Sequence, residues 1–215
     1  MSKAATVPAE APAKAAKSNQ APLLVAILPL LVLFVTAVVL FWLSKQDISG
    51  TFRYWEIFVP VVGAISLISG WGQAYLNDNP RLWYLVKQVV SWGALIALLY
   101  LLNSQGIRAA ISDQQYTAVI LYLLAFASLL VAIHMDLKLL VFAVFLVFCA
   151  FLIAVPENNP TLLAMGNRFG IADATTKPVM MTAIVACVGF VASFAILLMM
   201  RGALLTKRIA AKRRG

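Results

Sequence analysis

Six apolar stretches, separated by short polar segments, dominate the hydrophobic pattern of the chain. They cover residues 23–43, 57–75, 85–102, 116–133, 139–155 and 179–200. The hydrocarbon core of a bilayer is about 30 Å thick and is crossed by about 20 helical residues. Each stretch has, or nearly has, that length. The pattern therefore predicts an all-α, polytopic integral membrane protein, with a six-transmembrane-helix bundle over residues 23–200.

The fourth and fifth stretches form one apolar run from Tyr116 to Val155, interrupted only by His134, Asp136 and Lys138. A single helix of that length would far overshoot the bilayer. A tight hairpin at residues 134–138 instead places the three polar side chains at a membrane interface. We therefore predict two spans joined by an interfacial turn that contains His134, Asp136 and Lys138.

The composition excludes several classes of protein. Of the 215 residues, 63% are hydrophobic and 12% are charged, and the mean hydropathy is +0.93. Ordinary soluble domains are roughly 45–50% apolar and about 25% charged. So few charged residues cannot cover a water-soluble fold. The composition therefore argues against a soluble enzyme, a disordered chain and a disulfide-rich scaffold.

The basic residues predict the orientation of the spans. An even number of spans places both ends on one side, and if that side is the cytoplasm, 12 Lys and Arg residues lie inside and 5 outside. The tails carry this bias, because the internal loops alone hold 3 inside and 5 outside. We predict an N-in/C-in, multi-pass protein of the bacterial inner (cytoplasmic) membrane. Residues 1–22 form a disordered cytoplasmic tail, and residues 201–215 form a basic cytoplasmic tail.

The net charge of +9 comes mostly from these tails. A Lys or Arg residue near an anionic lipid surface contributes about 1 kcal/mol to membrane binding. Residues 207–214 are therefore expected to contact anionic lipid headgroups, and nucleic acid is not expected as a partner.

Candidate chemistry is sparse. Charged residues gather at the ends of the predicted spans, and none falls securely at mid-membrane, where an ionisable side chain marks a functional site. One histidine and two cysteines, Cys149 and Cys187, are too few for a haem or zinc centre. The sequence contains no nucleophile elbow, P-loop or dinucleotide fingerprint. We therefore expect no enzyme activity, no catalytic residue, no metal and no cofactor.

Small residues share one face of the second span. Gly63, Ser66, Gly70 and Ala74 are spaced i, i+3, i+7 and i+11. Such a face lets another helix approach closely. It is a candidate for helix packing within the chain, and the alternatives are an oligomer interface or a pore lining.

Polar residues cluster where the second and third spans meet the cytoplasmic side. The cluster consists of Gln73, Asn77, Asp78, Lys87 and Gln88. It is the place where we would look first for a solute site, although ordinary interfacial polarity also explains it. On the outer side, Leu162, Met165 and Phe169 alternate with polar residues in the segment 156–177, which is typical of a short helix on the membrane surface.

These observations favour a non-enzymatic integral membrane component, or scaffold, of a larger inner-membrane assembly. Its expected partners are other proteins or further copies of the chain. The support is the lack of buried chemistry, the small-residue face and the charged tails. The alternative is a channel or facilitative transporter for a small neutral solute or a lipid, which needs no buried charge.

Overall fold

The computed structural model describes residues 23–46, 50–76, 81–134, 137–155, 159–171 and 173–214. All regular secondary structure in these ranges is helical. The elements are α1 (Leu23–Ser44), α2 (Phe52–Leu76), α3 (Arg81–Ser104), α4 (Ile107–Ala110), α5 (Asp113–His134), α6 (Lys138–Ala154), α7 (Pro160–Phe169), the 3-10 helix η1 (Ala174–Thr176) and α8 (Pro178–Arg214). The predicted tail at residues 1–22, together with Asn77, Asp78 and Asp136, lies outside the described residues.

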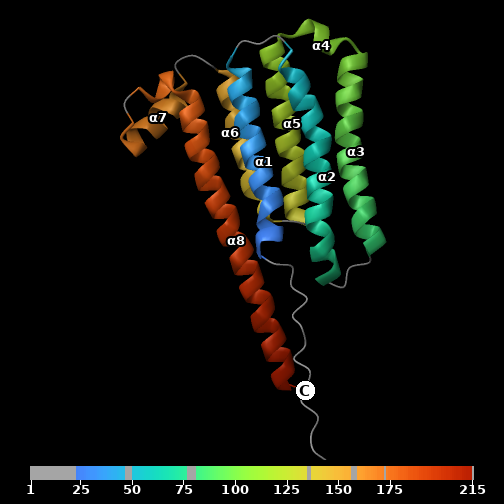
Figure 1. Ribbon diagram of the computed structural model, residues 1–215. Coiled ribbons are helices and arrows are strands. Elements are labelled where there is room, and N and C mark those ends of the chain that lie inside the picture. The colour runs from blue at the N-terminus through green and yellow to red at the C-terminus, as the bar shows by residue number, and fades with distance from the viewer. Residues whose placement is uncertain are drawn as a thin grey trace, which may run out of the picture.

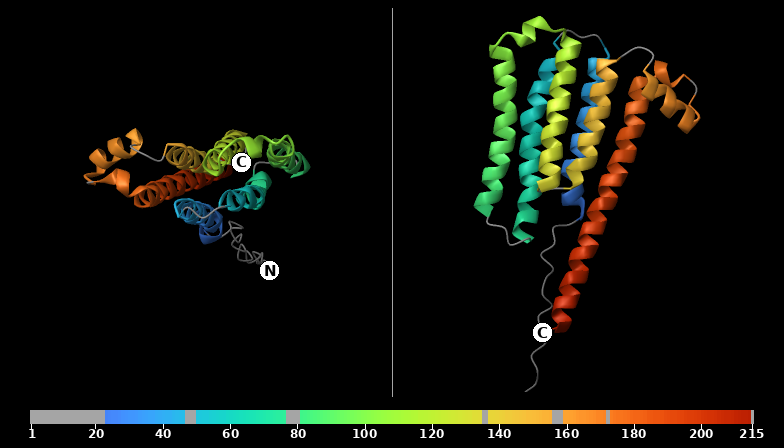
Figure 2. Two further views of the ribbon diagram at one scale, coloured as in Figure 1. Left: turned by 90° about the horizontal axis from the view of Figure 1, so that it is seen from above. Right: turned by 180° about the vertical axis from the view of Figure 1, so that it is seen from behind.

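The long helices run side by side and alternate in direction along the chain (Figure 1). Seen from above, the bundle is flattened: α3, α5 and α6 form one layer, and α2, α1 and α8 form the other (Figure 2). The two ends of the bundle differ. The end that carries α4, α7 and η1 is called the α4 end here, and the other, beyond which α8 projects, is called the opposite end.

Five helices are long and apolar enough to cross a membrane, by length and composition. They contain the segments Ile27–Ser44, Phe52–Ser69, Leu82–Ser104, Asp113–His134 and Pro178–Ala203. The remaining apolar helix, α6, has 17 residues. The structure is therefore that of an all-helical, multi-pass membrane protein.

The hairpin in the long apolar run lies where the sequence places it. Helix α5 ends at His134 and α6 begins at Lys138. The two helices lie against each other along their length, so the run is divided into an antiparallel pair (Figure 1).

Two helix boundaries differ from the expected spans by five residues or more. Helix α2 begins at Phe52, five residues before the expected start at Ile57, so Arg53 and Glu56 are helical. Helix α8 continues to Arg214 instead of ending near residue 200. Hydropathy marks where a helix leaves the bilayer but not where it ends, and the Ala, Leu, Lys and Arg residues beyond position 200 are all strong helix formers.

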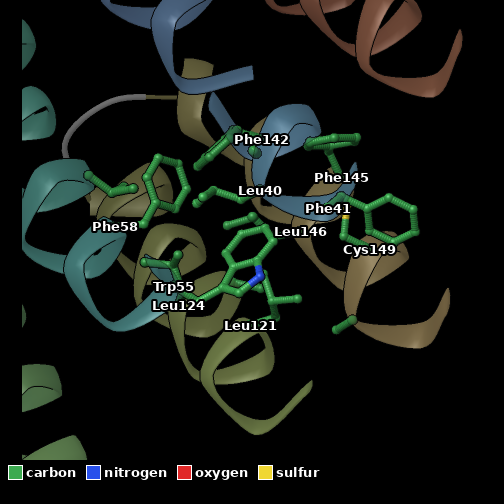
Figure 3. Packing of buried hydrophobic residues seen from close by; sticks show 14 of the residues in the cluster. Leu40, Phe41, Trp55, Phe58, Leu121, Leu124, Phe142, Phe145, Leu146 and Cys149 are labelled. Carbon is green, nitrogen blue, oxygen red and sulfur yellow. The ribbon is translucent and has the colours of Figure 1, made fainter. Parts of the chain in front are cut away.

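Aromatic rings fill the junction between α1, α6 and α8. The ring of Phe34 on α1 lies 5.3 Å from that of Phe142 and 5.2 Å from that of Phe145, both on α6. Gly189 of α8 packs beside Phe34, because a Cβ atom there would lie 3.0 Å from the ring. Figure 3 shows how this packing continues towards α2 and α5, where Trp55 is fully buried.

The short helix expected on the outer surface is α7. Asn159 caps it by accepting a hydrogen bond from the backbone N–H of Thr161, and Pro160 occupies the first turn, where its missing N–H costs nothing. A Cβ atom at Gly166 would lie 2.6 Å from that of Ala174, so only glycine allows α7 and η1 to pack this closely.

The Phe34 contacts generate a stability prediction. The Phe34→Ala variant should lose on the order of 2–3 kcal/mol of unfolding free energy, below the roughly 3–5 kcal/mol typical of soluble cores, because lipid rather than water surrounds the unfolded helices. Unfolding of the purified protein in detergent measures the loss. Phe126→Ala on α5, where the ring is 59% exposed, is the control and should change stability by less than about 1 kcal/mol. Equal losses in the two variants would contradict the packing argument.

Candidate functional site

Buried small and polar residues meet in the seam between α2 and α3. Gly63 and Ser66, two residues of the predicted small-residue face, are buried on α2. A Cβ atom at Gly63 would lie 3.1 Å from the indole of Trp92 on α3. The absent side chain therefore lets the indole pack directly against α2.

The amide of Gln88 is the centre of a hydrogen-bonded network in this seam. The indole N–H of Trp92 donates to Gln88 Oε1 at 2.8 Å, and Gln88 Nε2 donates to Tyr84 Oη at 3.1 Å. A longer contact of 3.4 Å joins Gln88 Nε2 to Ser66 Oγ. Gln88 is fully buried, so both ends of its amide are used within the protein.

The three α3 residues of this network are spaced i, i+4 and i+8. Tyr84, Gln88 and Trp92 therefore form a stripe of hydrogen-bonding side chains along one helix face. From the sequence, Gln88 was predicted to belong to a polar turn and was not connected with the two aromatic residues. Their common spacing, opposite the small residues of α2, is the signal that would have found the network.

The other residues of the predicted polar cluster are not gathered around Gln88. Lys87 is exposed, and its Nζ lies 5.5 Å above the ring centroid of Trp83. Asn77 and Asp78 lie outside the described residues, as does the side chain of Gln73. The surroundings of Gly70 and of the Ala74 side chain, the rest of the predicted packing face, are likewise outside the description.

In the predicted interfacial turn, one polar side chain is exposed and another is buried within the protein. His134 is exposed, and its Nδ1 lies 2.8 Å from the carbonyl oxygen of Leu130. Lys138 is instead only 4% exposed and donates from Nζ to Ser69 Oγ of α2 at 3.2 Å. A cavity of about 10 Å³ beside Lys138 and Ser69 has room for one water molecule at most. Lys138 therefore ties α6 to α2, a contact that hydropathy could not predict.

A second group of interacting polar residues lies at the α4 end and was not predicted from the sequence. The hydroxyl of Tyr116 on α5 donates to Glu56 Oε1 on α2 at 2.8 Å. The guanidinium of Arg108 lies 3.9 Å from the ring centroid of Phe52 and 4.9 Å from that of Tyr116, and it pairs with Asp113. Glu56 was visible in the sequence only as one of several charges near a span end.

Glu56 also borders a cavity between α2 and α3. The cavity has a volume of about 290 Å³. Its lining residues are Glu56, Val59, Pro60, Ile96, Leu99, Tyr100 and Asn103. A small-ligand pocket typically has about 300–1,000 Å³, so this cavity is near the lower limit for binding a part of a molecule.

The part of the chain that the structure describes contains no cluster of side chains that could bind a metal ion. No three His, Cys, Asp or Glu side chains come together there, Cys149 is buried on α6, and Cys187 faces outward on α8. Comparison with protein-family models, with curated proteins and with solved structures found no match. The chemistry of the site must therefore be argued from its own geometry.

The Gln88 network generates a second prediction. Gln88→Leu removes the acceptor of the Trp92 N–H inside the membrane, where a hydrogen bond between helices or side chains is worth about 0.6–1.7 kcal/mol. We expect a loss of about 1 kcal/mol or more in unfolding free energy, measured in detergent. Lys87→Leu, at the exposed neighbouring position, is the control and should have no comparable effect. A Gln88→Leu variant as stable as the wild type would show that the network contributes nothing.

Proposed function

We propose that the chain is a six-span protein of the bacterial inner membrane with both ends in the cytoplasm. The 17 residues of α6 fall just short of the usual length of a span, but α6 lies between α5 and α8 and is almost as long as the bilayer core is thick. On this arrangement the α4 end faces outward. The basic segment at the end of α8 then faces the anionic cytoplasmic leaflet.

Within that membrane, the chain functions as a non-enzymatic component or scaffold of a larger assembly. The observation that carries this proposal is that side chains fill the middle of the bundle. Phe34, Leu124, Phe145 and Leu146 come from three helices, and each is at most 2% exposed. A channel or transporter needs a path through this level. Among the described residues, these side chains leave no path between α1, α5 and α6 in this conformation, so the transport alternative is less well supported.

The shape of α8 supports an interaction role. Its 37 residues extend over about 55 Å at 1.5 Å per residue, well beyond the roughly 30 Å of a bilayer core. Figures 1 and 2 show that it continues past the other helices at the opposite end. A rigid basic helix projecting from the membrane offers a contact surface to a partner and to anionic headgroups.

Labelling of single cysteines tests the topology. In a background in which Cys149 and Cys187 are replaced by alanine, we expect Ser104→Cys and Asp173→Cys to react with a membrane-impermeant maleimide on intact cells. Thr206→Cys should react only after permeabilisation. Labelling at 104 but not at 173 would show that α6 does not cross the membrane. Labelling at 206 alone would show that the whole bundle is inverted.

Purification from native membranes in mild detergent, followed by quantitative mass spectrometry, tests the assembly. We expect a stoichiometric partner that is lost when the chain is truncated after Thr206 or when Gly70→Leu enlarges the small-residue face. Gly93→Leu is the matched control, because a Cβ atom at Gly93 meets nothing within 4 Å. Recovery of the same partners from both test variants, or of a monomer from the wild type, would refute the assembly proposal.

A further inference from the structure

The cavity between α2 and α3 at the α4 end is lined by polar residues near that end and by apolar residues deeper in the bundle. Its polar residues, Glu56, Tyr100 and Asn103, lie nearer that end of their helices. Ile96 lies seven residues before Asn103 on α3, which is about 10 Å deeper along the helix axis. Pro60 lies four residues beyond Glu56 on α2, about 6 Å deeper. The cavity is therefore polar at its mouth and apolar below, the pattern that an amphipathic molecule requires.

The mouth of the cavity is rich in hydrogen-bond acceptors. Glu56 brings a carboxylate, which accepts one hydrogen bond from Tyr116. Pro60 has no N–H, so the helical hydrogen bond from residue 60 to the carbonyl oxygen of Glu56 cannot form. The carboxylate and this carbonyl belong to the same residue, and Glu56 lines the cavity. A ligand seated here can donate hydrogen bonds to Glu56, while the Tyr100 hydroxyl and the Asn103 amide can donate to its acceptor atoms.

Within the described residues, no ion pair joins Glu56 to a Lys or Arg side chain. The ion pair at this end joins Arg108 to Asp113, and the guanidinium of Arg108 is also held against the rings of Phe52 and Tyr116. The Cζ atom of Arg53 lies 5.9 Å from the same ring centroid. A carboxylate at the edge of a bilayer is stabilised by an opposite charge, so the cavity is suited to a cationic group.

We propose that this cavity binds a bilayer lipid with a primary ammonium headgroup, such as a phosphatidylethanolamine. The ammonium group lies against Glu56 and donates to its carboxylate and backbone carbonyl. The upper part of an acyl chain or the glycerol region lies along Val59, Pro60, Ile96 and Leu99. At about 290 Å³ the cavity holds the headgroup side of the lipid, and the rest of the chain lies in the surrounding bilayer.

The ability of its headgroup to donate hydrogen bonds distinguishes this lipid from bilayer lipids with choline or glycerol headgroups. A choline headgroup has the same positive charge but no N–H, so it cannot use the two acceptors of Glu56. A glycerol headgroup gives the lipid a net negative charge, which the Glu56 carboxylate repels. The site therefore selects for N–H donors as well as for positive charge.

Native mass spectrometry of the full-length protein in mild detergent tests the proposal. The protein is titrated separately with phosphatidylethanolamine, phosphatidylcholine and phosphatidylglycerol that carry identical acyl chains. We expect the ethanolamine lipid to bind most tightly. Glu56→Gln should weaken its binding about tenfold, the usual size of one lost charged hydrogen bond, and should weaken the choline lipid less, because that lipid loses only the charge attraction.

Two further variants keep the test decisive. Asp173→Asn removes another carboxylate from the α4 end, at an exposed position with φ of 57° that asparagine also adopts readily, and it should leave lipid binding unchanged. Ile96→Trp fills the lower cavity without changing charge and should weaken the ethanolamine lipid even if Glu56→Gln does not fold. An ethanolamine preference that survives Glu56→Gln, unchanged affinity for the ethanolamine lipid in Ile96→Trp, or equal binding of the three lipids would overturn the proposal.

Discussion

Close packing between helices is the constraint on which this fold depends. In a bilayer, an apolar helix gains little by hiding its side chains from lipid, so association rests on van der Waals fit and on hydrogen bonds between helices. The Phe34 ring supplies such a fit by lying against Phe142 and Phe145 on one side and Gly189 on the other. The flattened two-layer arrangement brings α1 into contact with α2, α6 and α8, so this fit positions most of the bundle.

The same constraint determines where polar side chains can lie. A polar group inside the bundle gains from a partner there, because lipid offers none, and among the described residues the buried hydroxyls of Ser128 and Ser193 lack one. Trp92 donates to Gln88 on the same helix, α3, whereas Trp55 of α2 donates to Ser44 Oγ of α1 at 2.9 Å near the α4 end. Trp55 and Lys138 therefore tie neighbouring helices together through hydrogen bonds.

The sequence predicted the positions of the helices better than it predicted the contacts between them. Hydrophobic length located all six apolar helices and the turn before Lys138, because exclusion of polar groups from lipid is a local property of each segment. It could not show that Lys138 points inward to Ser69, or that Glu56 meets Tyr116 sixty residues away, because these contacts depend on which helices become neighbours. The end of α8 was missed for a different reason, since helix propensity continues beyond the membrane boundary.

The two ends of the bundle use charged side chains in opposite ways. At the opposite end, the Lys138 ammonium group is held by α2 beside a cavity no larger than one water molecule, so its charge serves to join helices. At the α4 end, Glu56 borders a space many times larger, which apolar residues line in its deeper part. A charge that only joined helices would not require that space. The volume beside Glu56, rather than the charge itself, is therefore what distinguishes a binding site from a structural tie in this bundle.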